Sequence, residues 1–207
     1  MMNVGITGNT GSDLDLVTSM IDKYYNIPVF DADLAFKFKL LYCPKSRQKI
    51  TDIFGSESYK NGLLNLERFK DQALYESLIS LFSEEITKKF LTWRYSKHSS
   101  NKIVLFKSMI LIEHGFNKSM DYNISVYKPK SMRVIETRNE KFLPSSLVNK
   151  IFNSEMGDEY KNSKTDYTIH NYEPYTISVK TLTEQISSIV EHLEKKSKPK
   201  ETTKWDF

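Results

Sequence analysis

The chain has 207 residues, of which 39% are hydrophobic and 27% are charged, and its formal net charge is +4. This composition predicts a globular domain with a sizeable core and excludes a disordered chain. The single cysteine, Cys43, excludes an internal disulfide framework and suits a reducing compartment, so we expect a cytoplasmic location, in the host cytoplasm if the source is a virus. We find no apolar run near the roughly 18 residues of a membrane span and no signal-peptide pattern, so we expect no membrane partner.

The first segment of the chain has the layout of a phosphate-binding loop. Residues 3–7 form a short apolar run typical of a strand, and a helical pattern resumes at Asp13. A phosphate-binding loop has the pattern G-x-x-x-x-G-K-[ST], in which backbone N–H groups and the helix N-terminus hold phosphates. The candidate cofactor-binding residues are the turn itself: Gly8, Asn9, Thr10, Gly11 and Ser12.

The loop keeps the spacing of that pattern but lacks its lysine and its serine or threonine. Counted from Gly8, Asp13 stands at the second glycine, Leu14 at the lysine and Asp15 at the serine or threonine. The residues therefore predict the backbone turn of a phosphate loop without its cation.

After a predicted helix over 12–24 and a predicted strand over 26–30, two carboxylates follow at Asp31 and Asp33. Ligands in open α/β sheets bind at the carboxyl edge of the strands, so these residues are well placed for phosphoryl chemistry. The alternative is that one of them caps the next helix, which runs through Leu34, Phe38 and Leu41.

The rest of the chain alternates helical and strand patterns. We expect a mostly helical region over 46–100, with apolar helical spacing from Leu66 to Trp93, strands at 103–106, 122–127 and 166–171, helices opening at Ser131 and Pro144, a polar loop over 155–165, and a last helix over 182–195. Glu113 ends an apolar run, and either faces a cleft or caps or pairs at the surface. This alternation predicts an α/β fold with a parallel sheet covered by helices on both faces.

Residues 195–207 differ from the preceding domain. A lysine-rich stretch with the composition of a solvated tail ends in Trp205, Asp206 and Phe207. Two large aromatic residues in such a tail resemble a short peptide that docks in an apolar pocket of a protein partner. The alternative is that Trp205 and Phe207 fold back onto their own domain. Nucleic acid is a weaker partner class, based only on the basic tail and the small net charge.

The ordered series of these features resembles the dephospho-CoA kinase family. The resemblance spans residues 4–171 and is carried by the loop, Asp31 to Asp33, Phe54-Gly55, the segment 62–74 with Arg68, the run 109–113, Arg138 and the triplet 169–171. It implies a P-loop kinase-like three-layer fold over 1–194, with a helical substrate-lobe insertion at about 60–100 and a lid-like segment at about 139–165.

The resemblance also implies roles for individual residues. In the family, ATP phosphorylates the 3′-hydroxyl of the ribose of dephospho-CoA. Asp33 would be the catalytic carboxylate, which accepts the hydroxyl proton or helps hold Mg²⁺. Arg68 would contact the substrate, and Arg138 would lie near the adenine and the lid.

The departures from the family pattern extend beyond the loop. The histidine-proline pair expected in the lobe is Ile79-Ser80, the aspartate before the apolar run is Lys107, and the arginines expected in the lid are Asp158 and Lys161. Phosphoryl transfer depends on positioning and charge stabilisation, and a like-charge contact at about 4 Å costs roughly 4 kcal/mol at an effective dielectric near 20. An Asp carboxylate in or near the phosphate nest would act as a built-in anion.

Two functions follow from these residues. The leading interpretation is a degenerate family member with little or no kinase activity, which needs no cofactor and acts as a scaffold or binding component of a larger viral or replication-type assembly through its tail. The alternative is an active ATP-dependent kinase of dephospho-CoA or another nucleotide or nucleoside. It would use Asp33, a Mg²⁺ held by Asp15, and a cation from Lys107 or Lys161.

Overall fold

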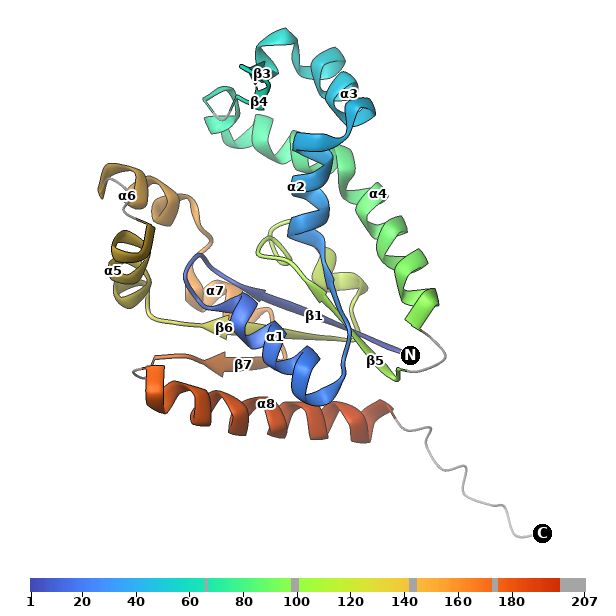
Figure 1. Cartoon of the computed structure of the whole chain (residues 1–207), viewed down its shortest axis with the longest axis vertical. Coiled ribbons are helices and arrows are strands. Elements are labelled where there is room, and N and C mark those ends of the chain that lie inside the picture. The colour runs from blue at the N-terminus through green and yellow to red at the C-terminus, as the bar shows by residue number, and fades with distance from the viewer. Residues whose placement is uncertain (66, 98–100, 142–144, 173–174, 198–207) are drawn as a thin grey trace, which may run out of the picture.

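The computed structural model describes residues 1–65, 67–97, 101–141, 145–172 and 175–197. A parallel five-stranded sheet lies at its centre in the order β2-β5-β1-β6-β7 (Figure 1). Its strands are β1 (Met2–Gly8), β2 (Val29–Asp31), β5 (Ile103–Lys107), β6 (Tyr122–Tyr127) and β7 (Tyr167–His170). The predicted α/β class and parallel sheet are confirmed.

Helices cover both faces of this sheet. They are α1 (Leu14–Tyr25), α2 (Ala32–Tyr42), α3 (Pro44–Phe54), α4 (Gln72–Lys97), α5 (Lys130–Lys141), α6 (Ser145–Ser154), α7 (Asp158–Ser163) and α8 (Tyr175–Ser197). Figure 1 shows α1 and α8 along the sheet, and α2, α3 and α4 rising from it into a lobe that also holds the short hairpin of β3 (Tyr59–Lys60) and β4 (Leu63–Leu64).

Alternation along the strands divides the core between the two faces. One cluster joins Val4, Ile6 and Leu105 to the apolar faces of α1 and α8. The other joins the next residues along, Val104 and Phe106, to α2 and α4. In the second cluster the rings of Phe30, Phe90, Trp93 and Phe106 lie with neighbouring centroids 5.1–6.1 Å apart. The lobe therefore shares its core with one face of the sheet.

The structure differs from the predicted elements at three places. The long helix begins at Gln72 rather than Leu66, because Asp71 ends the preceding turn and its carboxylate accepts a hydrogen bond from the Leu74 N–H at 3.0 Å. The polar segment 155–165 contains the short helix α7, whose residues show no apolar spacing. The last helix starts at Tyr175 rather than Leu182; the apolar residues that it places in the sheet core, Leu182, Ile186, Val190 and Leu193, are those that carried the predicted pattern.

Candidate functional site

The turn between β1 and α1 has the backbone shape of a phosphate loop. A Cβ on Gly8 would lie 2.3 Å from the Ser12 hydroxyl oxygen and 2.9 Å from the Val126 carbonyl oxygen, so only glycine fits there. Gly11 has a φ of +77°. Asp13 also lies in the left-handed region, with φ 64° and ψ 34°, which a glycine would occupy at little cost. Asp13 thus keeps the backbone of the glycine that the loop pattern calls for.

The Asp13 carboxylate turns toward the ends of the neighbouring strands. It accepts hydrogen bonds from Lys128 Nζ at 2.9 Å and from Asn171 Nδ2 at 2.7 Å. Lys128 also pairs with Glu136. Burial lowers the pKa of Lys128, but its hydrogen bonds to Glu136 and Asp13 outweigh burial and raise the pKa above its ordinary value. The negative charge of Asp13 is therefore compensated within the chain.

Leu14 belongs to the hydrophobic core. Its side chain is 6% exposed and lies in the cluster with Val4, Ile6 and Val17. The position where the loop pattern has a lysine therefore supplies no cation and instead anchors the first turn of α1 to the sheet.

Lys107 brings a cation to the loop from the end of β5. Its ammonium pairs with Asp15 and lies 2.7 Å from the Asp31 carboxylate. Asp31 and Lys107 are register partners on adjacent parallel strands, which places them together at the carboxyl edge of the sheet. Burial lowers the pKa of Lys107, and the hydrogen bonds to Asp15 and Asp31 overcome it, so the pKa is raised and the ammonium form is favoured.

The two carboxylates at the junction of β2 and α2 have separate roles. Asp31 caps α2, because its side chain accepts a hydrogen bond from the Leu34 N–H at 2.8 Å. Asp33 instead faces the segment after β5, where it accepts hydrogen bonds from the Met109 N–H at 2.9 Å and the Ser108 hydroxyl at 3.1 Å. Burial raises the pKa of Asp33 more than these hydrogen bonds lower it.

Lys161 holds the other side of the Met109 peptide. Its ammonium donates to the Met109 carbonyl oxygen at 2.7 Å and pairs with Glu113 at 2.8 Å. The Thr7 hydroxyl donates to the same carbonyl at 3.3 Å. Glu113, left open by the sequence between a cleft and a surface pair, is thus one half of a partly buried ion pair.

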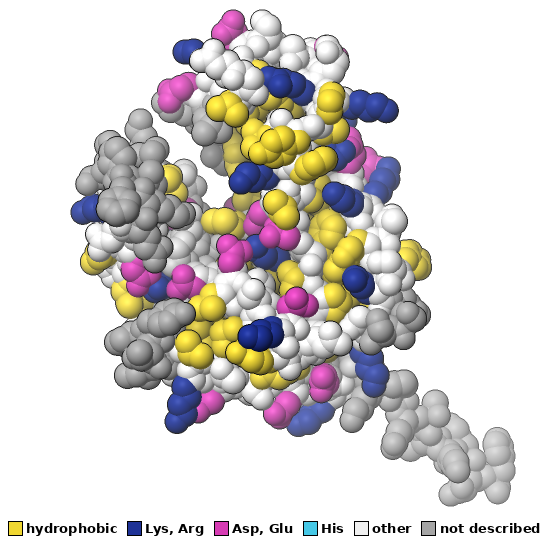
Figure 2. Space-filling model, viewed as in Figure 1, with side chains coloured by type: hydrophobic (Ala, Val, Ile, Leu, Met, Phe, Trp, Pro, Cys, Tyr) yellow, Lys and Arg dark blue, Asp and Glu magenta, His cyan; other side chains and the backbone are white. Residues whose placement is uncertain are grey.

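The segment that begins at α5 closes over the loop. Arg133, whose side chain is 1% exposed, pairs with Glu155 at 2.9 Å and with Asp158 at 2.9 Å. Glu155 also accepts a hydrogen bond from the Thr10 N–H at 2.7 Å, and the Asn9 side chain donates to Asp158 at 2.7 Å. Figure 2 shows acidic and basic side chains gathered at the hollow beneath the lobe.

The sequence did not single out Lys128, Arg133 or Glu155 as site residues. A usable signal for Lys128 existed, since it directly follows β6, a strand adjacent to β1, at the same edge as the loop. Glu155 had no such signal, because its contact with Thr10 depends on the path of α5 and α6.

Arg68 and Arg138, the other predicted site residues that the structure describes, are not among the ion pairs and hydrogen bonds around the loop given above. Arg68 lies in the lobe, where its guanidinium donates to the Phe54 carbonyl oxygen. Arg138 is exposed on α5. Their substrate roles stay predictions. Trp205, Asp206 and Phe207 lie outside the described residues.

In the described part of the chain, no group of three or more His, Cys, Asp or Glu side chains could hold a metal ion. Among the same residues, no helix combines the length and apolar character needed to cross a membrane.

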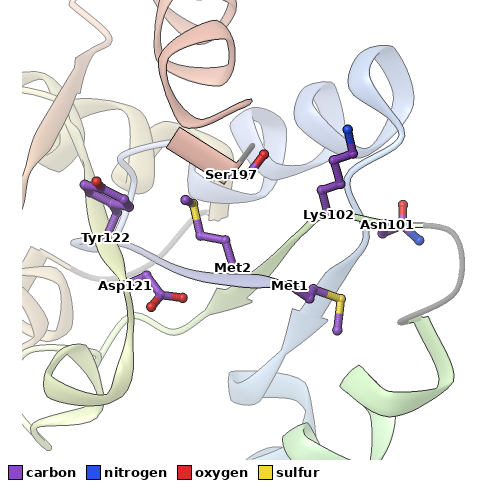
Figure 3. Close-up of a pocket in the computed structure, with 7 residues that line it drawn as sticks. All are labelled: Met1, Met2, Asn101, Lys102, Asp121, Tyr122 and Ser197. Atoms are coloured by element: carbon purple, nitrogen blue, oxygen red, sulfur yellow. The ribbon is translucent and has the colours of Figure 1, made fainter. Parts of the chain in front are cut away.

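A cavity of about 580 Å³ lies at the opposite end of the sheet (Figure 3). Its lining is Met1, Met2, Asn101, Lys102, Asp121, Tyr122 and Ser197. The strands begin there, whereas ligands of open α/β sheets bind where the strands end. The loop edge is therefore the candidate functional site.

Known proteins share both the sequence pattern and the fold. The profile of the dephospho-CoA kinase family matches residues 2–175. A dephospho-CoA kinase of Porphyromonas gingivalis is 27% identical over 183 residues, covering 86% of this chain and 89% of that protein. A dephospho-CoA kinase of Bacteroides fragilis is 25% identical over 175 residues, covering 82% and 84%.

Solved structures agree at the level of the fold. The protein TT1252 from Thermus thermophilus matches with a TM-score of 0.73 and 20% identity, covering 93% of this chain and 97% of that one. Dephospho-CoA kinase from Campylobacter jejuni matches with a TM-score of 0.60 and 16% identity, covering 95% and 98%. With a parallel sheet, a glycine turn after β1 and a family profile that spans most of its length, the chain belongs to the dephospho-CoA kinase family.

Proposed function

We propose that this family member has little or no kinase activity and acts through binding. The observation that carries the proposal is the loop itself, where buried Leu14 replaces the cation and Asp13 and Asp15 flank it. In phosphoryl transfer the protein contributes mainly positioning and charge stabilisation, so the loss of the lysine removes a central part of the machinery.

The charges around the loop support the same conclusion. A triphosphate would approach Asp13 and Asp15 at positions where the family pattern has no charge, although pairing with Lys128 and Lys107, and for Asp15 solvent exposure, reduces the repulsion. Lys107 and Lys128, the cations closest to these two carboxylates, are already bound to them. The loop is therefore electrostatically satisfied without a nucleotide.

A scaffold role within a larger assembly is the corresponding proposal for the tail. Its docking residues would be Trp205, Asp206 and Phe207. The double substitution Trp205→Ala with Phe207→Ala should remove a protein captured by the full chain. Capture that is unchanged by this double substitution would overturn that part of the proposal.

The second candidate is an active ATP-dependent phosphotransferase that acts on dephospho-CoA or another nucleotide or nucleoside. Lys107 favours it, because the ammonium stands between Asp15 and Asp31 at the loop edge, where a displaced loop lysine would be useful. The comparisons also favour it, since both the Porphyromonas and Bacteroides relatives are dephospho-CoA kinases.

The donor set around the loop fits this second candidate under one condition. Asp15, with a side chain that is 88% exposed, would hold Mg²⁺ once its pair with Lys107 opens. Mg²⁺ would supply charge neutralisation at the phosphates. Asp33 would accept the proton of the substrate hydroxyl, and its raised pKa suits a general base.

Calorimetry separates the two functions. ATP and ADP are titrated into the full chain with and without Mg²⁺, and turnover of dephospho-CoA is measured in parallel. We expect no binding at micromolar concentrations and no turnover. Micromolar, Mg²⁺-dependent ATP binding would overturn the first proposal. Absence of both nucleotide binding and dephospho-CoA turnover would overturn the second.

A further inference from the structure

We propose that the chain carries an anion site at its phosphate loop and fills this site with the carboxylate of Glu155. The inference deepens the proposed function and rests on it, because it identifies what occupies the loop in place of a phosphate. The ligand class of the vacated site would be a small phosphate-type anion.

The donors around Glu155 are those of an anion site. The Thr10 N–H donates to one carboxylate oxygen at 2.7 Å, and Arg133 Nη1 donates to the other at 2.9 Å. A backbone N–H of a glycine-rich turn and a guanidinium are the groups that proteins use to bind phosphate. Both oxygens of Glu155 are thus bound as a phosphate's oxygens would be.

Burial and hydrogen bonds to backbone carbonyl groups fix the side chain of Arg133 beside the loop. Its side chain is 1% exposed, Nε donates to the Lys128 carbonyl oxygen at 2.8 Å, and Nη1 donates to the Thr10 carbonyl oxygen at 2.8 Å. Nη2 donates hydrogen bonds to both carboxylate oxygens of Asp158, at 3.0 and 2.9 Å. Loss of Glu155 alone would leave the guanidinium in place with Asp158 as its remaining acidic partner.

The backbone of the loop fits tightly against α5. A Cβ at Gly11 would lie 3.1 Å from the Thr137 hydroxyl oxygen and 3.2 Å from the Arg133 Cβ. The Asn9 side chain donates to the Met156 carbonyl oxygen at 2.9 Å. Asn9 and Thr10 therefore hold the segment of Glu155 against the turn, while Gly11 packs against α5.

Intramolecular occupancy explains how the loop is stable without a ligand. A tethered carboxylate competes with a free anion as though present at about millimolar concentration or more. An external phosphate must therefore displace Glu155 before it binds, and this requirement is independent of whether the loop ever holds ATP.

The test compares the full chain with Glu155→Ala and Glu155→Gln, and uses Glu159→Ala as the matched control, because Glu159 is exposed on α7. Inorganic tripolyphosphate and inorganic phosphate are titrated by calorimetry without nucleotide or Mg²⁺. Exchange of the Thr10 amide hydrogen is followed by NMR, and thermal unfolding establishes that each variant is folded.

We expect Glu155→Ala to bind tripolyphosphate roughly tenfold or more tightly than the wild type, with faster exchange at Thr10, and Glu159→Ala to match the wild type. Equal affinity in wild type and Glu155→Ala would overturn self-occupancy. Faster exchange without anion binding in either folded Glu155 variant would overturn the anion site. Failure of the proposed function is a separate result, since it appears as Mg²⁺-dependent ATP binding by the wild type.

Discussion

Lys107 and Asp15 form an ion pair that ties the end of β5 to the first turn of α1. The family pattern has an aspartate at the position of Lys107 and a serine or threonine at the position of Asp15. The contact therefore joins the same two places in the fold, but with different charges. The pair connects two elements that are 92 residues apart in the chain.

Replacing Lys107 with Met should destabilise the fold by about 1–2 kcal/mol, because it leaves the Asp31 carboxylate without its buried partner. Asp15 contributes little to this loss, since its side chain is 88% exposed. Urea unfolding measures the effect, with Lys37→Met at an exposed position of α2 as the control. A variant as stable as the control would show that the Lys107 contacts contribute nothing.

Gly8→Ala should destabilise the chain by about 2–3 kcal/mol, because the added methyl group would lie 2.3 Å from the Ser12 hydroxyl oxygen and 2.9 Å from a backbone oxygen. Gly157→Ala is the matched control, with nothing within 4 Å of its added Cβ. Thermal or urea unfolding compares the two. Similar unfolding free energies for both variants would mean that the turn between β1 and α1 is looser than described.

The raised pKa of Asp33 predicts a pH-dependent stability. A carboxyl with a folded pKa above its usual 3.8 takes up a proton more readily in the folded state, so its contribution to stability falls as pH rises through the interval between the two values. Asp33→Asn should remove this dependence and gain stability relative to the wild type as pH rises through that interval to neutrality.

Urea unfolding over a series of pH values checks this expectation. Asp22→Asn, at an exposed position on α1, is the control. A stability difference between wild type and Asp33→Asn that stays constant with pH would contradict the raised pKa.

Restoring the family residues in the loop should restore nucleotide binding. The combined variant Asp13→Gly, Leu14→Lys, Asp15→Ser and Lys107→Asp returns the lysine and removes the added carboxylates from the phosphate positions. We expect Mg²⁺-dependent ATP binding at micromolar concentrations in this variant and none in the wild type. Calorimetry on both, with Asp13→Gly alone as the control, measures the difference.

That experiment also bears on the second candidate function. If Lys107 already serves as the displaced cation, the combined variant should gain nothing over the wild type. ATP binding by the wild type that disappears in Lys107→Met would support the active enzyme.

The sequence predicted the sheet and most elements because their signals are local. The continuous apolar run at 103–106 marked a strand that is buried along its whole length, and the glycines of the turn marked the loop. The orientation of the charged side chains was not local. Asp15 finds Lys107 and Asp13 finds Lys128 only once parallel strands have brought their ends to one edge.

The hypothesis of a built-in anion had the right kind of group at the wrong positions. We expected Asp13 or Asp15 near the nest, yet their carboxylates turn to Lys128 and Lys107. The carboxylate on the loop N–H belongs to Glu155, which lies far away in the sequence. Because α5 and α6 determine where Glu155 lies, spacing around the loop could not identify it.

The aromatic cluster beneath the lobe has a consequence for motion. Phe106 of the sheet and Phe90 of α4 meet edge to face, with centroids 5.1 Å apart, and Phe30 joins both. Swinging the lobe as a rigid body would separate these rings and expose them to water, which is costly for large buried aromatic side chains. We therefore expect the lobe to stay in place relative to the sheet. A ligand would then reach the loop through movement of the segment from α5 to α7.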